Sequence, residues 1–296
     1  MTGDAALGAQ LQLAGQHLAR GDTRAAKARL AAILAQAPGQ PDALFMLGVV
    51  LAMQGDHAGA IGQFDLAIRA RPGHVQALAQ QARSLDALGR REEAISRAEA
   101  VGRLQADPWS LDTAGVVMTR AGRHAAAADL YGRAARMGQA PGYHYNHGSA
   151  LVFLGRFEEA RAAFRACLAC SPDHGPAWAG LVNITKQTRE QNEIPRLTAI
   201  AQALASDPSA MHTLGHAIAK AYEDIGEPTQ SMAWLARAKA GMADRVDMAG
   251  DAALCDAAAS SLAVAGFEGC GDAGPIFVVG LPRSGTTLTD RILSNH

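Results

Sequence analysis

The chain has 296 residues, of which 49% are hydrophobic, so it is long enough to bury a core as one large domain or two ordinary ones. Its 27 lysines and arginines nearly balance 28 aspartates and glutamates, which argues against nucleic acid or an acidic membrane surface as a partner. Frequent alanines, few β-branched runs and 5% aromatic residues favour closely packed helices over sheet, so we expect an all-α fold.

The N-terminal sequence and the cysteines bear on cellular location. Before residue 275 no window approaches the roughly 18 apolar residues of a membrane span, and the start of the chain, with Asp4 and no basic region, lacks a signal-peptide layout. The 4 cysteines are too few and too unevenly spaced for a disulfide framework, so we expect reduced thiols. We therefore interpret the protein as cytoplasmic, without a membrane partner.

The first organised feature in chain order is a repeat with a period of about 34 residues. Its complete form is seen in residues 41–74, which carry Leu44, Leu47, Gly48 and Leu51 on one helix face, Gly55 at a turn, Ala60, Phe64 and Ala67 on a second face, and Pro72 at the exit. Two helices joined by a short turn form an antiparallel hairpin. This is the tetratricopeptide pattern.

The same columns recur on both sides of this copy. Residues 7–40 carry Leu13, Ala14, Gly21, Ala26, Leu30, Ile33 and Pro38. The third copy carries Leu78, Ala82, Leu85, Gly89, Ala94 and Ala98, and the fourth Leu111, Gly115, Met118, Gly122, Ala127, Tyr131 and Ala134. The fifth carries Gly148, Leu151, Gly155, Ala160, Phe164, Cys167 and Pro172.

The sixth copy, residues 175–209, keeps only Trp178, Leu181 and a closing Pro208. Because Pro195 lies inside it, we expect a degenerate or differently wound unit. A seventh copy from about His212 to Val246 carries Ala219, Tyr222, Gly226, Ser231, Leu235 and Ala238.

Stacking explains the whole array. A single hairpin leaves an apolar face exposed, and neighbouring hairpins bury it. Residues 7–246 are therefore predicted to form a solenoid of about seven helix-turn-helix units, with a groove lined by the first helix of each unit. We expect this groove to bind a peptide or a protein surface.

The groove residues limit what the ligand can be. Tetratricopeptide domains that hold a chaperone's C-terminal carboxylate place Lys and Asn at fixed groove positions, but here the fifth position of the first helix holds Phe45, Ala79, Asp112 and Tyr145. The carboxylate clamp is therefore absent. A mixed, partly apolar groove is formed by Phe45, Val49, Met53, Trp109, Val116, Tyr145 and Phe153. It suits either an extended segment of a partner or the chain's own neighbouring domain.

The pattern changes towards the C-terminus. Residues 247–274 are interpreted as a linker helix and spacer, and after Pro275 the run 276–279 is the only strongly strand-like stretch. It is followed by the loop GLPRSGTT at residues 280–287 and by Leu288, Ile292 and Leu293 at helical spacing. Strand, glycine loop and helix in this order predict a phosphate-binding site.

The loop's residue types fit that chemistry. Backbone N–H groups at a helix N-terminus favour an anion, and Ser284, Thr286 and Thr287 add hydroxyl donors. Gly285 permits close approach of the backbone, and Arg283 can bond phosphate through two nitrogens. Because Thr286 stands where a Walker loop needs Lys, hydrolysis of ATP or GTP is disfavoured.

The stretch FVVGLPRSGTTL, residues 277–288, closely resembles the 5′-phosphosulfate-binding loop of sulfotransferases, which use 3′-phosphoadenosine 5′-phosphosulfate (PAPS) as sulfuryl donor. The form with Arg283 looks like the protein-tyrosine and bacterial branches of that family. Residues 214–238, LGHAIAKAYEDIGEPTQSMAWLARA, are similar to the last helical repeat of bacterial proteins that fuse a tetratricopeptide array to a sulfotransferase domain.

The resemblance implies that the donor's 5′-phosphosulfate is held by Arg283, Ser284, Gly285, Thr286 and Thr287, without a metal. It further implies that residues 275–296 begin an incomplete α/β sulfotransferase domain whose catalytic base and 3′-phosphate site lie beyond His296. The expected function is sulfuryl transfer to a protein tyrosine or carbohydrate hydroxyl, with this chain alone inactive. The alternative is a non-catalytic scaffold for protein interaction.

Overall fold

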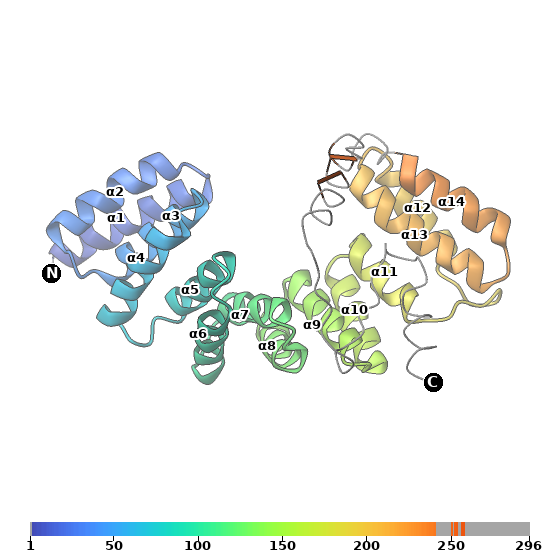
Figure 1. Cartoon of the computed structure of the whole chain (residues 1–296), viewed down its shortest axis with the longest axis horizontal. Coiled ribbons are helices and arrows are strands. Elements are labelled where there is room, and N and C mark those ends of the chain that lie inside the picture. The colour runs from blue at the N-terminus through green and yellow to red at the C-terminus, as the bar shows by residue number, and fades with distance from the viewer. Residues whose placement is uncertain (1, 241–249, 251, 254–255, 258–296) are drawn as a thin grey trace, which may run out of the picture. The chain divides into compact units, whose positions relative to one another are not determined.

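The computed structural model describes residues 2–240, 250, 252–253 and 256–257. Over residues 2–240 it has 14 helices and no strand (Figure 1). They are α1 (Thr2–Ala19), α2 (Thr23–Gln36), α3 (Pro41–Met53), α4 (His57–Ala70), α5 (Val75–Ala87), α6 (Arg91–Arg103), α7 (Pro108–Arg120), α8 (His124–Met137), α9 (Pro141–Phe153), α10 (Phe157–Cys170), α11 (Gly175–Asn183), α12 (Ile194–Ala203), α13 (Pro208–Asp224) and α14 (Pro228–Ala240). The predicted all-α array is confirmed.

The chain divides into two compact units, Met1–Ala243 and Asp244–His296. The helical array belongs to the first unit. The predicted strand, loop and helix of residues 275–296 lie outside the described residues, as does most of the predicted linker 247–274.

A recurring turn joins the helices of each regular hairpin. After α3, Gly55 has φ +84°, its N–H donates to Ala52 O at 3.1 Å, and the N–H of Asp56 donates to Leu51 O at 2.9 Å. This is a Schellman motif, in which the left-handed position favours glycine. Asp56 then caps α4 by accepting from Gly59 N at 2.8 Å. Positive φ values are found at all six predicted turn glycines: Gly21, Gly55, Gly89, Gly122, Gly155 and Gly226.

Within a hairpin, a glycine on the first helix faces an aromatic ring on the second. A Cβ on Gly48 would lie 2.5 Å from the Phe64 ring, and one on Gly148 would lie 2.7 Å from the Phe164 ring. The glycine column of the repeat is therefore explained by the space that these rings occupy.

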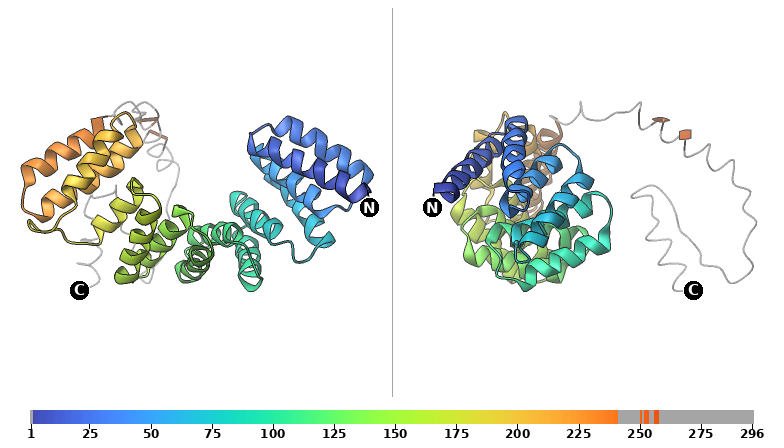
Figure 2. Two further views of the ribbon diagram at one scale, coloured as in Figure 1. Left: turned by 180° about the vertical axis from the view of Figure 1, so that it is seen from behind. Right: turned by 90° about the vertical axis from the view of Figure 1, so that its left-hand side faces the viewer.

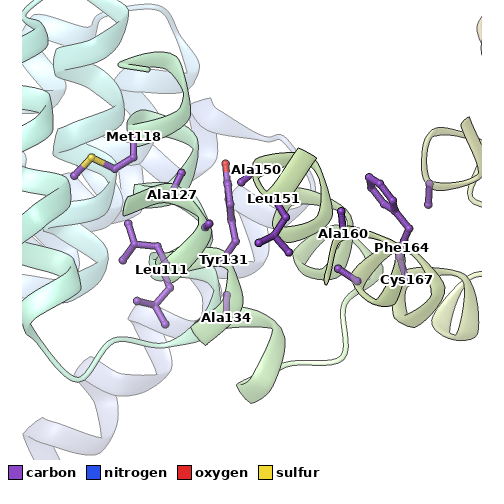
Figure 3. Packing of buried hydrophobic residues seen from close by; sticks show 14 of the residues in the cluster. Leu111, Met118, Ala127, Tyr131, Ala134, Ala150, Leu151, Ala160, Phe164 and Cys167 are labelled. Carbon is purple, nitrogen blue, oxygen red and sulfur yellow. The ribbon is translucent and has the colours of Figure 1, made fainter. Parts of the chain in front are cut away.

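The core runs from one hairpin to the next. Figure 3 shows Tyr131 of α8 and Leu151 of α9 between the fourth and fifth units, with Phe164 and Cys167 of α10 beyond them. Leu111 and Leu151 are fully buried, as their repeat columns predict. Such stacking gives each hairpin the apolar partner that it lacks alone.

The sixth unit departs from the hairpin form, as predicted. Its helices are short and are separated by residues 184–193, and both α11 and α12 pack against α13. Pro195 lies in the first turn of α12, where a missing N–H breaks no helical bond. The view from behind shows the α13–α14 hairpin beside this unit (Figure 2, left).

One boundary was predicted wrongly. Pro208 does not close the sixth unit but opens α13, where Asp207 accepts from Ser209 N at 2.8 Å and from Ala210 N at 3.1 Å. Proline at the first helical position, directly after a capping Asp, has a preset φ and no N–H to leave unsatisfied. The last helix of the array ends at Ala240, and residues 241–246 lie outside the described part.

Candidate functional site

The first helices of the units form what we call the first-helix face, and two pockets open on it. The N-terminal pocket has a volume of about 770 Å³, with walls from α1, α3 and the turn between α4 and α5. Its lining includes Leu11, Gln12, Gln16, Phe45, Met46 and His74. The lining combines apolar side chains with side-chain amides and with the charged pair Asp42 and Arg71.

An ion pair and a histidine form one wall of this pocket. Arg71 donates to both carboxylate oxygens of Asp42 at 2.9 and 2.8 Å, and these bonds lower the pKa of Asp42. Burial, and then the charge of Arg71, lower the pKa of His74, whose Nδ1 accepts from Ala77 N at 3.4 Å. The neutral ring therefore carries its proton on Nε2, which lies 3.5 Å from Asp42 Oδ1 without a hydrogen-bond partner among the described residues.

The C-terminal pocket lies between α9 and α11 and reaches α13. Its volume is about 440 Å³, and its lining includes Ser149, Val152, Phe153, Ala179, Asn183 and Ile184. Phe153 stands at its edge with 69% of its surface exposed. An exposed aromatic ring beside a largely apolar hollow is typical of a protein interaction site.

Equivalent aromatic pairs support the two pockets. The Phe45 ring lies 5.1 Å from the His74 ring, and the Tyr145 ring lies 5.2 Å from the His174 ring, at similar tilts of 42° and 44°. Both histidines also cap the helix that comes after them, by accepting from Ala77 N and Ala177 N. Each pocket wall is therefore held in place by a helix cap.

The predicted groove residues fall into three groups. Phe45, Tyr145 and Phe153 line the pockets. Val49 and Val116 are half-buried against the core. Met53 and Trp109 are 53% and 42% exposed outside the two pockets. A mixed, partly apolar face is thus confirmed, although only part of the predicted set forms pocket walls.

The remaining fifth positions do not present a ligand-binding cation or amide. Ala79 is fully buried in the core. Asp112 accepts from Asn146 Nδ2 at 2.8 Å, and burial raises the pKa of its carboxyl. The carboxylate clamp that the sequence excludes has no substitute at these positions.

The sequence prediction missed the polar part of the pockets. Gln12, Gln16 and Asn183 carry no pattern that sets them apart from solvent-facing residues. The histidines could have been found, because His74 and His174 recur two residues after Pro72 and Pro172. That recurrence marks the turn between units, which is where a solenoid brings successive first helices together.

Cys167 and Cys170 form a C-x-x-C pair, and Cys167 has a structural role. Cys167 is fully buried in the core, and this burial raises its pKa to about 11, whereas Cys170 is exposed. Across the part of the chain that the structure describes, no three His, Cys, Asp or Glu side chains gather as a metal site would need. The burial of Cys167 agrees with its place in a column of the fifth repeat copy.

The predicted phosphate loop cannot be placed in the same way. Arg283, Ser284, Gly285, Thr286 and Thr287 all lie outside the described residues. The role expected for them rests on the sequence of the loop.

Two family models match the chain. The tetratricopeptide repeat model matches residues 11–75 and 119–175, and the sulfotransferase family model matches residues 275–296. No curated protein sequence matches the chain. None of the described helices has the length and apolar character to cross a membrane.

Several solved structures share the fold. The structure reported for pilF of Pseudomonas aeruginosa has 19% identity and a TM-score of 0.55, covering 78% of this chain and 98% of its own. The C-terminal part of a TPR repeat-containing protein from Cytophaga hutchinsonii has 13% identity and a TM-score of 0.55, covering 81% and 98%. The Cut9–Hcn1 complex of the APC/C has 16% identity and a TM-score of 0.52, covering 78% and 42%. At such identities the likeness shows the fold alone. The described helical array of this chain is therefore an all-helical solenoid of tetratricopeptide repeats.

Proposed function

We propose that the array binds an extended segment of a partner protein on its first-helix face. The observation that carries this proposal is the C-terminal pocket, a hollow of about 440 Å³ beside Phe153, a residue that is 69% exposed although one face of its ring stacks on His124. An apolar side chain of the partner fills the hollow, where Val152 and Ile184 supply apolar contact.

Polar groups beside the hollow hold the partner's backbone. Ser149 and Asn183 can each donate and accept hydrogen bonds along an extended chain, because an amide and a hydroxyl carry both functions. The N-terminal pocket extends this face with the side-chain amides of Gln12 and Gln16. One face therefore combines apolar pockets with side-chain donors and acceptors that can bond the backbone of a peptide.

This proposal predicts that Ser149→Arg blocks peptide binding. Ligands are selected from a random-sequence peptide library on the wild-type protein, resynthesised and measured by fluorescence polarisation. Because Ser149 lines the pocket, a long charged side chain there should weaken binding at least about tenfold, which is about 1.4 kcal/mol.

Ala162→Arg is the matched control, since Ala162 is exposed on α10 and does not line either pocket. It should bind the selected peptides as the wild type does. Equal affinity of all three proteins, or equal weakening by both substitutions, would place binding elsewhere and exclude this face.

We further propose that the protein transfers a sulfuryl group from PAPS to the hydroxyl of a protein tyrosine or a carbohydrate. Support comes from the sulfotransferase family match at residues 275–296 and from the loop sequence GLPRSGTT. In this reaction the acceptor's hydroxyl oxygen bonds to sulfur and gives its proton to the base expected beyond His296, while the bond from sulfur to the 5′-phosphate oxygen breaks. Arg283 and the hydroxyls of Ser284, Thr286 and Thr287 stabilise the negative charge left on the phosphate. In this proposal the helical array selects or presents the acceptor.

The loop proposal predicts that Arg283→Ala weakens donor binding. In protein that also contains the residues expected beyond His296, calorimetry with 3′-phosphoadenosine 5′-phosphate, the donor without its sulfuryl group, should show binding to the wild type and about tenfold weaker binding to the variant, because hydrogen bonds to charged groups contribute about 1.5–3 kcal/mol. Arg291→Ala removes the same charge outside the loop and should bind normally. Failure of the wild type to bind, or indifference to Arg283→Ala, would exclude a donor site in this loop.

A further inference from the structure

The segment 184–193 of the sixth unit has a fixed conformation although it is not helical. Gln187 is only 4% exposed, and its backbone N–H donates to Asp224 Oδ2 at 2.9 Å. Its side chain donates to Thr185 O at 3.0 Å and accepts from Glu193 N at 3.0 Å. A buried amide with all these partners ties both ends of the segment to each other and to α13.

This segment forms one side of a pocket that lies on α10, the second helix of the fifth unit. The basic pocket, as we call it, has a volume of about 300 Å³. Its charged lining residues are Arg161, Arg165, Lys186 and Glu193, three cations and one carboxylate. A regular hairpin has no such hollow, because its two helices pack directly against each other.

The cations differ in how they are held. Arg161 is positioned by the protein itself, since its Nη1 donates to Ile184 O at 2.6 Å and its other edge pairs with Glu158. Arg165 follows on the same helix face one turn later. Neither Arg165 nor Lys186 forms an ion pair or side-chain hydrogen bond with any residue that the structure describes.

Hydrogen-bonding groups without partners also lie at this pocket. The hydroxyl oxygen of Thr185 is buried and has no partner in the described part of the chain. The hydroxyl of Thr188 accepts from Gln191 N at 3.1 Å, which leaves its proton for donation. A second hollow of about 330 Å³ adjoins the first, shares Arg165 and Glu193 with it, and adds Arg196. The charge excess therefore continues beyond the basic pocket.

We propose that the basic pocket binds a phosphate monoester. Its lining residues carry a net charge of +2, of which Glu158 offsets one unit through its ion pair with Arg161, and the remaining positive charge attracts the charge of about −1.5 to −2 that such an ester carries at neutral pH. Guanidinium groups bond phosphate oxygens in pairs, the Lys186 ammonium adds a point charge, and the Thr188 hydroxyl donates to a third oxygen. The volume leaves room for part of the group that carries the phosphate. This site depends neither on the first-helix face nor on residues 280–287.

Calorimetry with phenyl phosphate tests the proposal, at constant ionic strength set with chloride. The protein carries Arg283→Ala throughout, which reduces any contribution of the proposed donor loop. We expect binding that Arg165→Ala combined with Lys186→Ala weakens at least about tenfold, because two charge-assisted contacts are lost. The matched control, Lys27→Ala combined with Arg29→Ala, removes the same charge from exposed positions of α2 and should leave binding unchanged.

Phenyl sulfate has nearly the same shape with a single negative charge and should bind more weakly than phenyl phosphate. Binding of inorganic phosphate would show that the ion alone is recognised, and tighter binding of the phenyl ester would show that the carrier group contributes. The proposal is overturned if phenyl phosphate does not bind, or if the Arg165 and Lys186 variant binds it as the parent does. Circular dichroism confirms that each variant is folded.

Discussion

Phe164→Ala is expected to lower the free energy of unfolding by about 3–5 kcal/mol, at the upper end of what large-to-small core substitutions cost. Phe164 is 2% exposed on α10, and its ring is faced by two glycines. A Cβ on Gly148 would lie 2.7 Å from the ring, and one on Gly180 would lie 2.6 Å from it. Since neither glycine has a side chain to move into the vacated volume, the cavity stays open.

Phe157→Ala is the control on the same helix, because Phe157 is 47% exposed. It should cost less than about 1 kcal/mol, as surface substitutions usually do. Urea unfolding followed by circular dichroism gives the comparison, and hydrogen exchange should show the loss in the fifth unit and its neighbours, because each repeat contacts only adjacent repeats. Similar losses for the two variants would contradict the packing described for Phe164.

The packing of the Phe164 column was predictable because the same pattern of residues recurs in several repeat units. Phe64 and Phe164 occupy the same column, and so do the turn glycines Gly55 and Gly155 with positive φ. Local turn chemistry and contacts between neighbours fix these positions, and both depend on residues close in sequence.

The sixth unit shows where such prediction stops. Pro195 indicates that the pattern breaks, but proline can either end a helix or begin one. The conformation of residues 184–193 depends on Gln187 and Asp224, which are 37 positions apart and follow no repeat column. The basic pocket could not be predicted for that reason. Polar pocket residues such as Asn183 were missed because an amide on a helix surface looks the same whether or not it lines a hollow.

A second large loss of stability is expected from a substitution in the α13–α14 hairpin. Gly215→Ala is expected to lower the free energy of unfolding by about 3 kcal/mol, the upper part of the range for overpacked cores. A Cβ on Gly215 would lie 2.7 Å from Ala238 Cβ, 3.2 Å from Ala238 Cα and 3.4 Å from Trp234 O. None of these atoms can rotate away, so the two helices must separate and lose contact along their length.

Gly62→Ala is the same chemical change in a place without neighbours. Gly62 is exposed on α4, and a Cβ there would meet nothing within 4 Å. Helix propensity should therefore stabilise the protein by up to about 1 kcal/mol. Urea unfolding should give opposite signs for the two variants, and hydrogen exchange should place the loss for Gly215→Ala in α13 and α14. Because propensity favours alanine at both positions, a negative sign at Gly215 alone can come only from the close approach of the two helices. Stabilisation by both substitutions would show that the helices do not approach so closely.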